Sequence, residues 1–164
     1  MEDRVRLLFI DDDELLLGAL KRTFSKEPYE LHVANSGRLG LEIVAQKNID
    51  IVVCDHLMPG MTGIEFFEIL FEKHRNVMRV MLSGVGALPQ PASEAGPNTG
   101  PVLPIDLATK SKLNAAKTAL KTHAYNEGQV HRYIEKPWKD LELKTVIADM
   151  AAIIRSTRRK RPSV

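Results

Sequence analysis

Five polar side chains of types that bind metals or take part in catalysis follow short apolar segments of the sequence. They are Asp11, Asp12, Asp55, Ser83 and Lys136. The apolar segments before them are rich in aliphatic and β-branched residues and span 5–10, 49–54, 77–82 and 130–134. Short segments of this kind, bounded by polar residues, are typical of buried strands. We therefore expect each of the five side chains at the end of a strand.

The residue types in this set favour phosphoryl chemistry at a metal. Carboxylates that lie close together repel one another, so a cation is expected between the three aspartates. Mg²⁺ prefers a few carboxylate ligands and completes its shell with water and a phosphate oxygen. A carboxylate beside such a metal can attack phosphorus and form an acyl phosphate. The lysine and the hydroxyl would then stabilise the phosphoryl oxygens.

Helical segments alternate with the expected strands. Apolar spacing predicts helices over about 14–26, 37–47, 63–73, 106–125 and 139–156, and one further strand over 29–34. Ser36 is predicted to cap the second helix, and Thr62 with Glu65 to form a capping box at the third. This alternation favours a parallel sheet with helices on both faces. The carboxyl ends of such strands meet at one edge, so the five side chains are expected to converge there.

Length and composition limit the other function classes. A chain of 164 residues, 44% hydrophobic and 27% charged, is expected to be one globular domain. Its single cysteine, Cys54, excludes an intrachain disulfide and a multi-cysteine zinc site, and it and His56 are expected to be packing residues. No apolar run approaches the roughly 20 residues of a membrane helix, and the charged start shows no signal peptide. We expect a cytoplasmic protein with no membrane partner.

The net charge of +2 is distributed unevenly along the chain. Residues 155–164 carry five basic residues and no acid, so the remainder has a net charge of −3. We expect a folded domain over 1–154 and a basic tail, or the start of a linker, over 155–164. A short charged run is usually solvated, so we expect no binding of nucleic acid at physiological salt.

Four motifs together resemble the receiver domain of bacterial response regulators. They are Phe9–Asp13, Val53–Gly63, Met81–Gly84 and Tyr133–Trp138. The resemblance covers residues 5–84 and about 115–154. It implies an α/β fold, a flavodoxin-like doubly wound five-stranded parallel sheet with strand order 2-1-3-4-5.

The resemblance also implies the ligands of the metal and of the phosphoryl group. Asp55 would be the phosphoacceptor. Asp11 and Asp12 would bind Mg²⁺ together with Asp55, and the backbone carbonyl of Leu57 would be a further ligand. The phosphoryl donor would be a phosphohistidine on a sensor histidine kinase or a phosphotransfer protein. The chain would be a signalling phosphoprotein, not an enzyme in the usual sense, and would catalyse only its own phosphorylation and dephosphorylation.

Three further residues would transmit the signal if the resemblance holds. Ser83 would be the switch hydroxyl, Lys136 would pair with the phosphate, and Tyr133 would be the aromatic side chain that changes rotamer. The Lys136–Pro137 bond would be cis. The output would be contact with an unidentified downstream protein, with a homodimer as an open alternative.

One segment departs from the family pattern. Ser83 and Lys136 are 53 positions apart. That is about 30 more than two loops, a helix and a short strand need. We expect an insertion between the fourth and fifth strands at about 85–114. Its proline-rich part, 86–106, is expected to be mobile because it lacks apolar periodicity.

Two other function classes are compatible with part of the pattern. A haloacid-dehalogenase-like phosphatase would use Asp11, Asp13, Ser83 and Lys136, but it would leave Asp55 without a role. A receiver-shaped interaction module that does not depend on phosphorylation would not need the complete set of acids, serine and lysine.

Overall fold

The computed structural model describes residues 4–84, 107–126 and 128–160. Five strands and five helices alternate along this part of the chain. The strands are β1 (Val5–Ile10), β2 (Tyr29–Ala34), β3 (Ile51–Asp55), β4 (Met78–Gly84) and β5 (Arg132–Lys136). The helices are α1 (Glu14–Phe24), α2 (Gly37–Lys47), α3 (Gly63–Lys73), α4 (Leu107–Asn126) and α5 (Asp140–Arg159).

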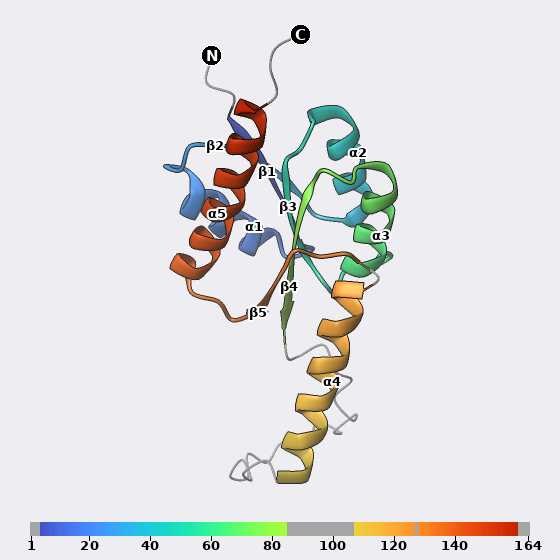
Figure 1. The fold of residues 1–164 in the computed structure, drawn as a ribbon. Helices are drawn as coiled ribbons and strands as arrows, with labels where there is room; N and C mark the ends of the chain where they lie inside the picture. Colours follow the sequence, from blue (N-terminus) through green and yellow to red (C-terminus); the bar gives the residue numbers. More distant parts are fainter. Residues whose placement is uncertain (1–3, 85–106, 127, 161–164) are drawn as a thin grey trace.

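All five strands form one parallel sheet in the order β2-β1-β3-β4-β5. This confirms the predicted flavodoxin-like, doubly wound sheet. Helices α1 and α5 cover one face, and α2, α3 and the last turns of α4 cover the other (Figure 1). Because every strand is parallel to its neighbours, all the carboxyl ends lie at one edge of the sheet.

The core lies on both faces of the central strand. Every residue of β3 is buried. Val52 and Cys54 pack against the side of α2 and α3, whereas Ile51 and Val53 pack against α1 and α5. A strand covered on both sides reads as a continuous apolar run, which is why residues 49–54 show no alternation. Each large apolar side chain buried in this way contributes about 1.5–3 kcal/mol.

The helix caps predicted from the sequence are present. The Ser36 hydroxyl accepts a hydrogen bond from the backbone N–H of Leu39 at 3.3 Å. At α3 the Thr62 hydroxyl accepts from the backbone N–H of Glu65, while the Glu65 carboxylate accepts from the backbone N–H of Thr62 at 2.7 Å. These caps satisfy backbone donors that have no partner within the helix.

Several element boundaries differ from those predicted, by one to three residues. β5 begins at Arg132 instead of residue 130, because Gln129 has a φ of 48° and turns the chain just before the strand. α5 continues to Arg159, past the predicted end near 156, so residues 155–159 of the expected tail are helical. The last turn of α5 is held by an ion pair between Arg158 and Asp50.

Helix α4 extends past the end of the sheet at which β4 ends (Figure 1). Its Leu120 and Ala124 pack against the core, whereas Ser111, Lys112, Asn114 and Ala115 are exposed. The last positions of the insertion predicted at 85–114 therefore belong to this helix. The predicted mobility of residues 86–106 lies outside the described residues. None of the helices in the described ranges is both long and apolar enough to cross a membrane.

Candidate functional site

The strand-end residues converge at the carboxyl edge of the sheet, as the sequence predicts. Carboxylate oxygens of Asp11, Asp12 and Asp55 all lie within 4.8 Å of one another. The Nζ of Lys136 lies 2.8 Å from Oδ1 of Asp55 and 2.9 Å from Oδ2 of Asp11. Ser83 is buried at the end of β4, between β3 and β5.

The three consecutive aspartates after β1 have three different environments. Asp11 is 2% exposed, and its Oδ1 accepts a hydrogen bond from the backbone N–H of Asp13 at 2.9 Å. Asp12 is exposed. Asp13 caps α1, because its Oδ1 accepts from the backbone N–H groups of Leu15 and Leu16 at 2.9 and 3.1 Å. Only the first two acids therefore face the cluster around Asp55.

The charges at this edge leave an excess of negative charge. Burial raises the pKa of Asp55, Lys136 opposes this, and the carboxylates of Asp11 and Asp12 raise it further. Burial alone would lower the pKa of Lys136, but its hydrogen bonds to Asp55 and Asp11 outweigh burial and raise it. Three carboxylates and one ammonium group suit a divalent cation that binds oxygen ligands, so the donor set fits Mg²⁺.

The loop between β3 and α3 is packed tightly against the end of β3. A Cβ at Gly63 would clash with the backbone oxygen of Asp55, so only glycine allows this approach. The backbone N–H of Gly63 donates to the carbonyl of His56 at 2.8 Å. Leu57, whose carbonyl is the expected metal ligand, lies in this loop with 45% of its surface exposed.

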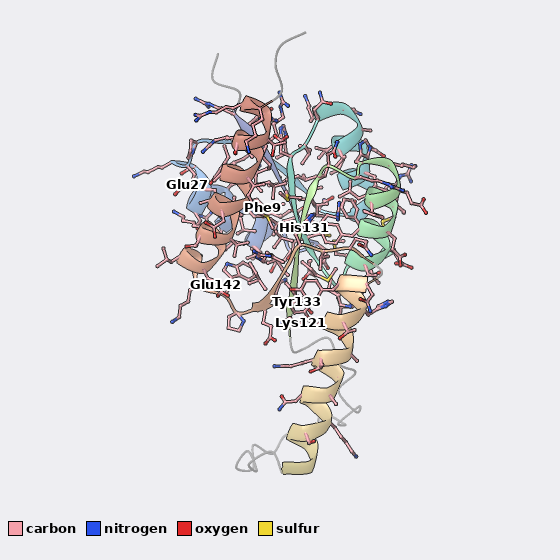
Figure 2. The ribbon with its side chains drawn as sticks, viewed as in Figure 1. Phe9, Glu27, Lys121, His131, Tyr133 and Glu142 are labelled. Atoms are coloured by element: carbon pink, nitrogen blue, oxygen red, sulfur yellow. The ribbon has the colours of Figure 1, made fainter. Side chains whose placement is uncertain are left out.

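Ser83 and Tyr133 lie side by side beneath the last turns of α4. Burial raises the pKa of the Tyr133 phenol, and a hydrogen bond with the Ser83 side chain opposes this shift. The Nζ of Lys121, from α4, lies 5.7 Å from the centroid of the Tyr133 ring, and Figure 2 shows both side chains where α4 meets the sheet. Tyr133 therefore contacts both the strand-end serine and α4.

Two buried residues border Asp55 along the chain. The Cys54 thiol is fully buried, and burial followed by the charge of Asp55 raises its pKa well above the usual value, so it stays a thiol in the core as predicted. His56 is 8% exposed, and its Nδ1 has no hydrogen-bond partner among the described residues. Burial, and then the charge of His123, lowers the pKa of His56.

One contact at this site has no signal in the sequence. Lys121 approaches Tyr133 from α4, and Lys117, four positions earlier on the same helix, pairs with Glu135 of β5 at 3.5 Å. Charged positions on an exposed helix carry no periodicity that points to a particular partner.

A family model matches this chain. The model described as the response regulator receiver domain matches residues 7–96. Sporulation initiation phosphotransferase F of Bacillus subtilis is 30% identical over 104 residues, which cover 62% of this chain and 84% of that protein. The heme response regulator HssR of Staphylococcus epidermidis is 31% identical over 84 residues. The matched region spans 37% of HssR, and it spans 17% of the hydrogenase transcriptional regulatory protein HoxA of Cupriavidus necator.

Solved structures show the same fold. The signal receiver domain of an HD domain-containing protein from Pseudomonas fluorescens is 26% identical, with a TM-score of 0.68 over 93% of this chain and 98% of that one. A CheY-like receiver domain protein from Methanospirillum hungatei is 20% identical, with a TM-score of 0.69 over 94% of this chain and 99% of that one, and shows similarity of fold alone. The chain belongs to the response regulator receiver domain family.

Proposed function

We propose that this chain accepts a phosphoryl group on Asp55 in a Mg²⁺-dependent reaction. The observation that carries the proposal is the position of the Asp55 carboxylate, 2.8 Å from the Nζ of Lys136 and within 4.8 Å of the acid oxygens of Asp11 and Asp12. The donor is a phosphohistidine on a sensor histidine kinase or a phosphotransfer protein. An oxygen of Asp55 forms the new bond to phosphorus, the phosphorus–nitrogen bond breaks, and its electron pair returns to the imidazole.

The residues around Asp55 prepare it for this step. Asp11 holds Lys136 through its Oδ2, so the ammonium group stays beside Asp55 instead of turning to solvent. Lys136 then stabilises the negative charge on the phosphoryl oxygens. Asp11, Asp12, Asp55 and the carbonyl of Leu57 would hold Mg²⁺, which supplies further charge stabilisation when bound.

Ser83 and Tyr133 would carry the change outwards. We expect the Ser83 hydroxyl to turn towards the phosphoryl group, which removes its hydrogen bond with Tyr133. Tyr133 would then be free to change rotamer beneath α4, whose Lys121 contacts its ring. The signal would pass by protein–protein contact to a downstream partner that recognises this surface.

The phosphatase alternative is less well supported. It requires the carboxylate of Asp13 as a catalytic group, but this side chain is exposed and bonded to two amides at the start of α1. It also leaves unexplained why Lys136 is shared between Asp11 and Asp55.

The test is phosphorylation by a small donor. With Mg²⁺ and acetyl phosphate, intact-protein mass spectrometry should show one added phosphoryl group that is stable in acid and labile in alkali. Asp55→Asn should abolish it, whereas the control Asp13→Asn should not. Stoichiometric labelling of another residue in the Asp55→Asn protein would falsify the assignment.

Metal binding gives a second measurement. Asp12→Ala should weaken Mg²⁺ binding more than Ser83→Ala, because Ser83 is proposed to contact phosphate and not the metal. A titration with the reverse order would contradict the proposed ligand set.

A further inference from the structure

A hollow of about 740 Å³ lies at the amino-terminal edge of the sheet, opposite the acidic cluster. The charged residues that line it are five basic residues and one acid. They are Arg4, Lys26, Arg155, Arg158, Arg159 and Glu27. They come from the start of β1, the turn after α1 and the last turns of α5. In Figure 1 the end of α5 and the start of β1 lie at the end of the molecule away from α4.

The acid in the hollow and one of its arginines are already paired. The Glu27 carboxylate accepts from the Nζ of Lys144 at 2.9 Å. The Arg158 guanidinium donates to Oδ1 of Asp50 at 2.6 Å. For the other four basic residues, no acidic partner occurs within the described ranges. The described residues that line the hollow therefore carry an excess of positive charge.

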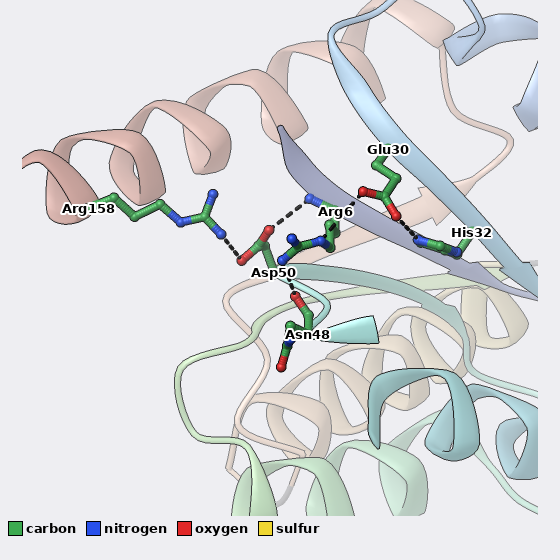
Figure 3. A network of polar contacts seen from close by, with 6 residues as sticks. All are labelled: Arg6, Glu30, His32, Asn48, Asp50 and Arg158. Carbon is green, nitrogen blue, oxygen red and sulfur yellow. Dashed lines mark hydrogen bonds and ion pairs between the residues drawn. The ribbon is translucent and has the colours of Figure 1, made fainter. Parts of the chain in front are cut away.

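The wall formed by α5 is held in place. Figure 3 shows Asp50 between Arg158 of α5 and the backbone N–H of Arg6 in β1, which donates to Oδ2 at 2.8 Å. Arg155 and Arg159 are four positions apart on the same helix and so share one face. The charge of Arg155 reaches Tyr29 in β2, where it opposes the rise in the pKa of the phenol caused by burial.

The dipole of α5 explains the position of only some of these basic residues. Basic residues in the last turn of a helix interact favourably with its carboxyl end. That accounts for Arg159 and does not account for Arg4 or Lys26, which lie outside the helix and face the same hollow. Two arginines four positions apart on a helix also repel each other. The four basic side chains without an acidic partner therefore repel one another, and a bound anion would offset this repulsion.

We propose that this hollow binds a small anion that carries several phosphate groups. Guanidinium groups match phosphate oxygens with paired hydrogen bonds, and lysine adds a mobile point charge. The volume is in the range of small-ligand pockets, about 300–1,000 Å³. None of the described residues that line it is aromatic, so it lacks the platforms on which the bases of single strands stack. An oligophosphate or the phosphorylated headgroup of a lipid shares the required chemistry.

The test is a calorimetric titration of the whole chain with inorganic tripolyphosphate. The titration is carried out without divalent metal and at an ionic strength of about 0.15 M. At this ionic strength exposed charges more than about 8 Å apart are largely screened. We expect saturable binding of one tripolyphosphate per chain. Arg155→Glu with Arg159→Glu should reduce the affinity at least about tenfold.

One further test variant and two control variants show whether the anion binds in this hollow. Lys26→Glu changes the wall outside the helix and should also weaken binding, and it replaces the double variant as the test if the double variant is impaired in folding. Arg38→Glu, an equally cationic and largely exposed position on α2, should change the affinity less than about twofold. Lys136→Met should leave binding unchanged, which excludes the acidic edge as the binding site.

Vesicles containing a phosphorylated inositol lipid distinguish the two sources of phosphate. If the chain binds these vesicles more tightly than tripolyphosphate, and the double variant loses this binding, the ligand is a lipid headgroup. If tripolyphosphate binds more tightly, the ligand is a soluble oligophosphate. The proposal is wrong if tripolyphosphate does not saturate, if Arg38→Glu weakens binding as much as the double variant, or if duplex DNA alone binds through Arg155 and Arg159.

Discussion

Ion pairs hold both edges of the sheet, but the charge left over has the opposite sign. At the carboxyl edge Lys136 is shared by Asp55 at 2.8 Å and Asp11 at 2.9 Å, and Asp12 adds a third carboxylate. At the amino edge Arg158 lies 2.6 Å from Asp50, and further cations remain around it. A paired charge mainly fixes its neighbours in place. The net charge that remains decides which kind of ligand each edge attracts, a cation at the carboxyl edge and an anion at the amino edge.

The edges also differ in how firmly the charged groups are held. At the carboxyl edge Asp11 and Asp55 are buried residues at the ends of strands, where low polarity strengthens each interaction. At the amino edge Arg159 and Lys26 are exposed on a helix end and a turn. Substitutions at the carboxyl edge should therefore have the larger effects and the weaker dependence on salt.

The largest effect is expected from Lys136→Met. Removing one preorganised charge from a developing anion slows reactions by roughly 10²–10³-fold, so phosphorylation by acetyl phosphate should slow by at least about a hundredfold. Mg²⁺ affinity should not fall, because the three carboxylates then lack their competing cation. The rate is followed by intact mass and the metal by calorimetry. Lys139→Met, an exposed neighbour, is the control. An unchanged rate would contradict the role of Lys136.

At the amino edge, Asp50→Asn should destabilise the fold. Asp50 accepts hydrogen bonds from the backbone N–H of Arg6 and from the Arg158 guanidinium, and both bonds weaken without the charge (Figure 3). We expect the free energy of unfolding to fall by about 1–2 kcal/mol, measured by urea denaturation. Asp149→Asn, exposed on α5, should have little effect. Equal stability of the Asp50→Asn protein and the wild type would mean that the pair does not anchor α5.

An aspartate-to-asparagine substitution at the carboxyl edge should have the opposite effect on stability. Asp55→Asn should raise Tm at neutral pH without metal. Because burial raises the pKa of Asp55 despite Lys136, ionisation of this carboxyl opposes folding, and stability is lost as the pH rises through the folded pKa. The gain in the variant should vanish below about pH 4, where the carboxyl is protonated in both states. A lower Tm for Asp55→Asn at neutral pH would show that its pair with Lys136 stabilises the fold overall.

The smallest effect concerns His131, which directly precedes β5 (Figure 2). Its Nδ1 accepts a hydrogen bond from the backbone N–H of Arg79 at 3.0 Å, and burial, then Arg79 and Arg132, lower its pKa. The folded state therefore binds fewer protons than the unfolded chain, and stability should fall as the pH drops below about 6.5. His131→Asn should reduce this slope in urea denaturation at several pH values. The pKa of His56 is lowered too, so His56 should account for part of the pH dependence that remains in His131→Asn. An unchanged slope in His131→Asn would contradict this account.

Much of the fold and of the acidic edge could be predicted from local patterns. The apolar runs that end at Asp11 and Asp55 are strands, and the capping box of Thr62 and Glu65 starts α3 where expected. Alternation of strands and helices implies parallel strands, and parallel strands bring their ends together. The convergence of Asp11, Asp55 and Lys136 follows from these rules without any knowledge of side-chain packing.

The elements, their parallel arrangement and the acidic cluster can therefore be read from the sequence, because each depends on periodicity or on a strand end. Which acids are paired, where α4 points, and that Arg4, Lys26 and Arg155 border one hollow are properties of the folded chain alone. Asp50 and Arg158 are 108 positions apart, and their contact depends on the angle at which α5 crosses the sheet. Long charged side chains on exposed positions follow no period, so only packing of the whole chain selects their partners.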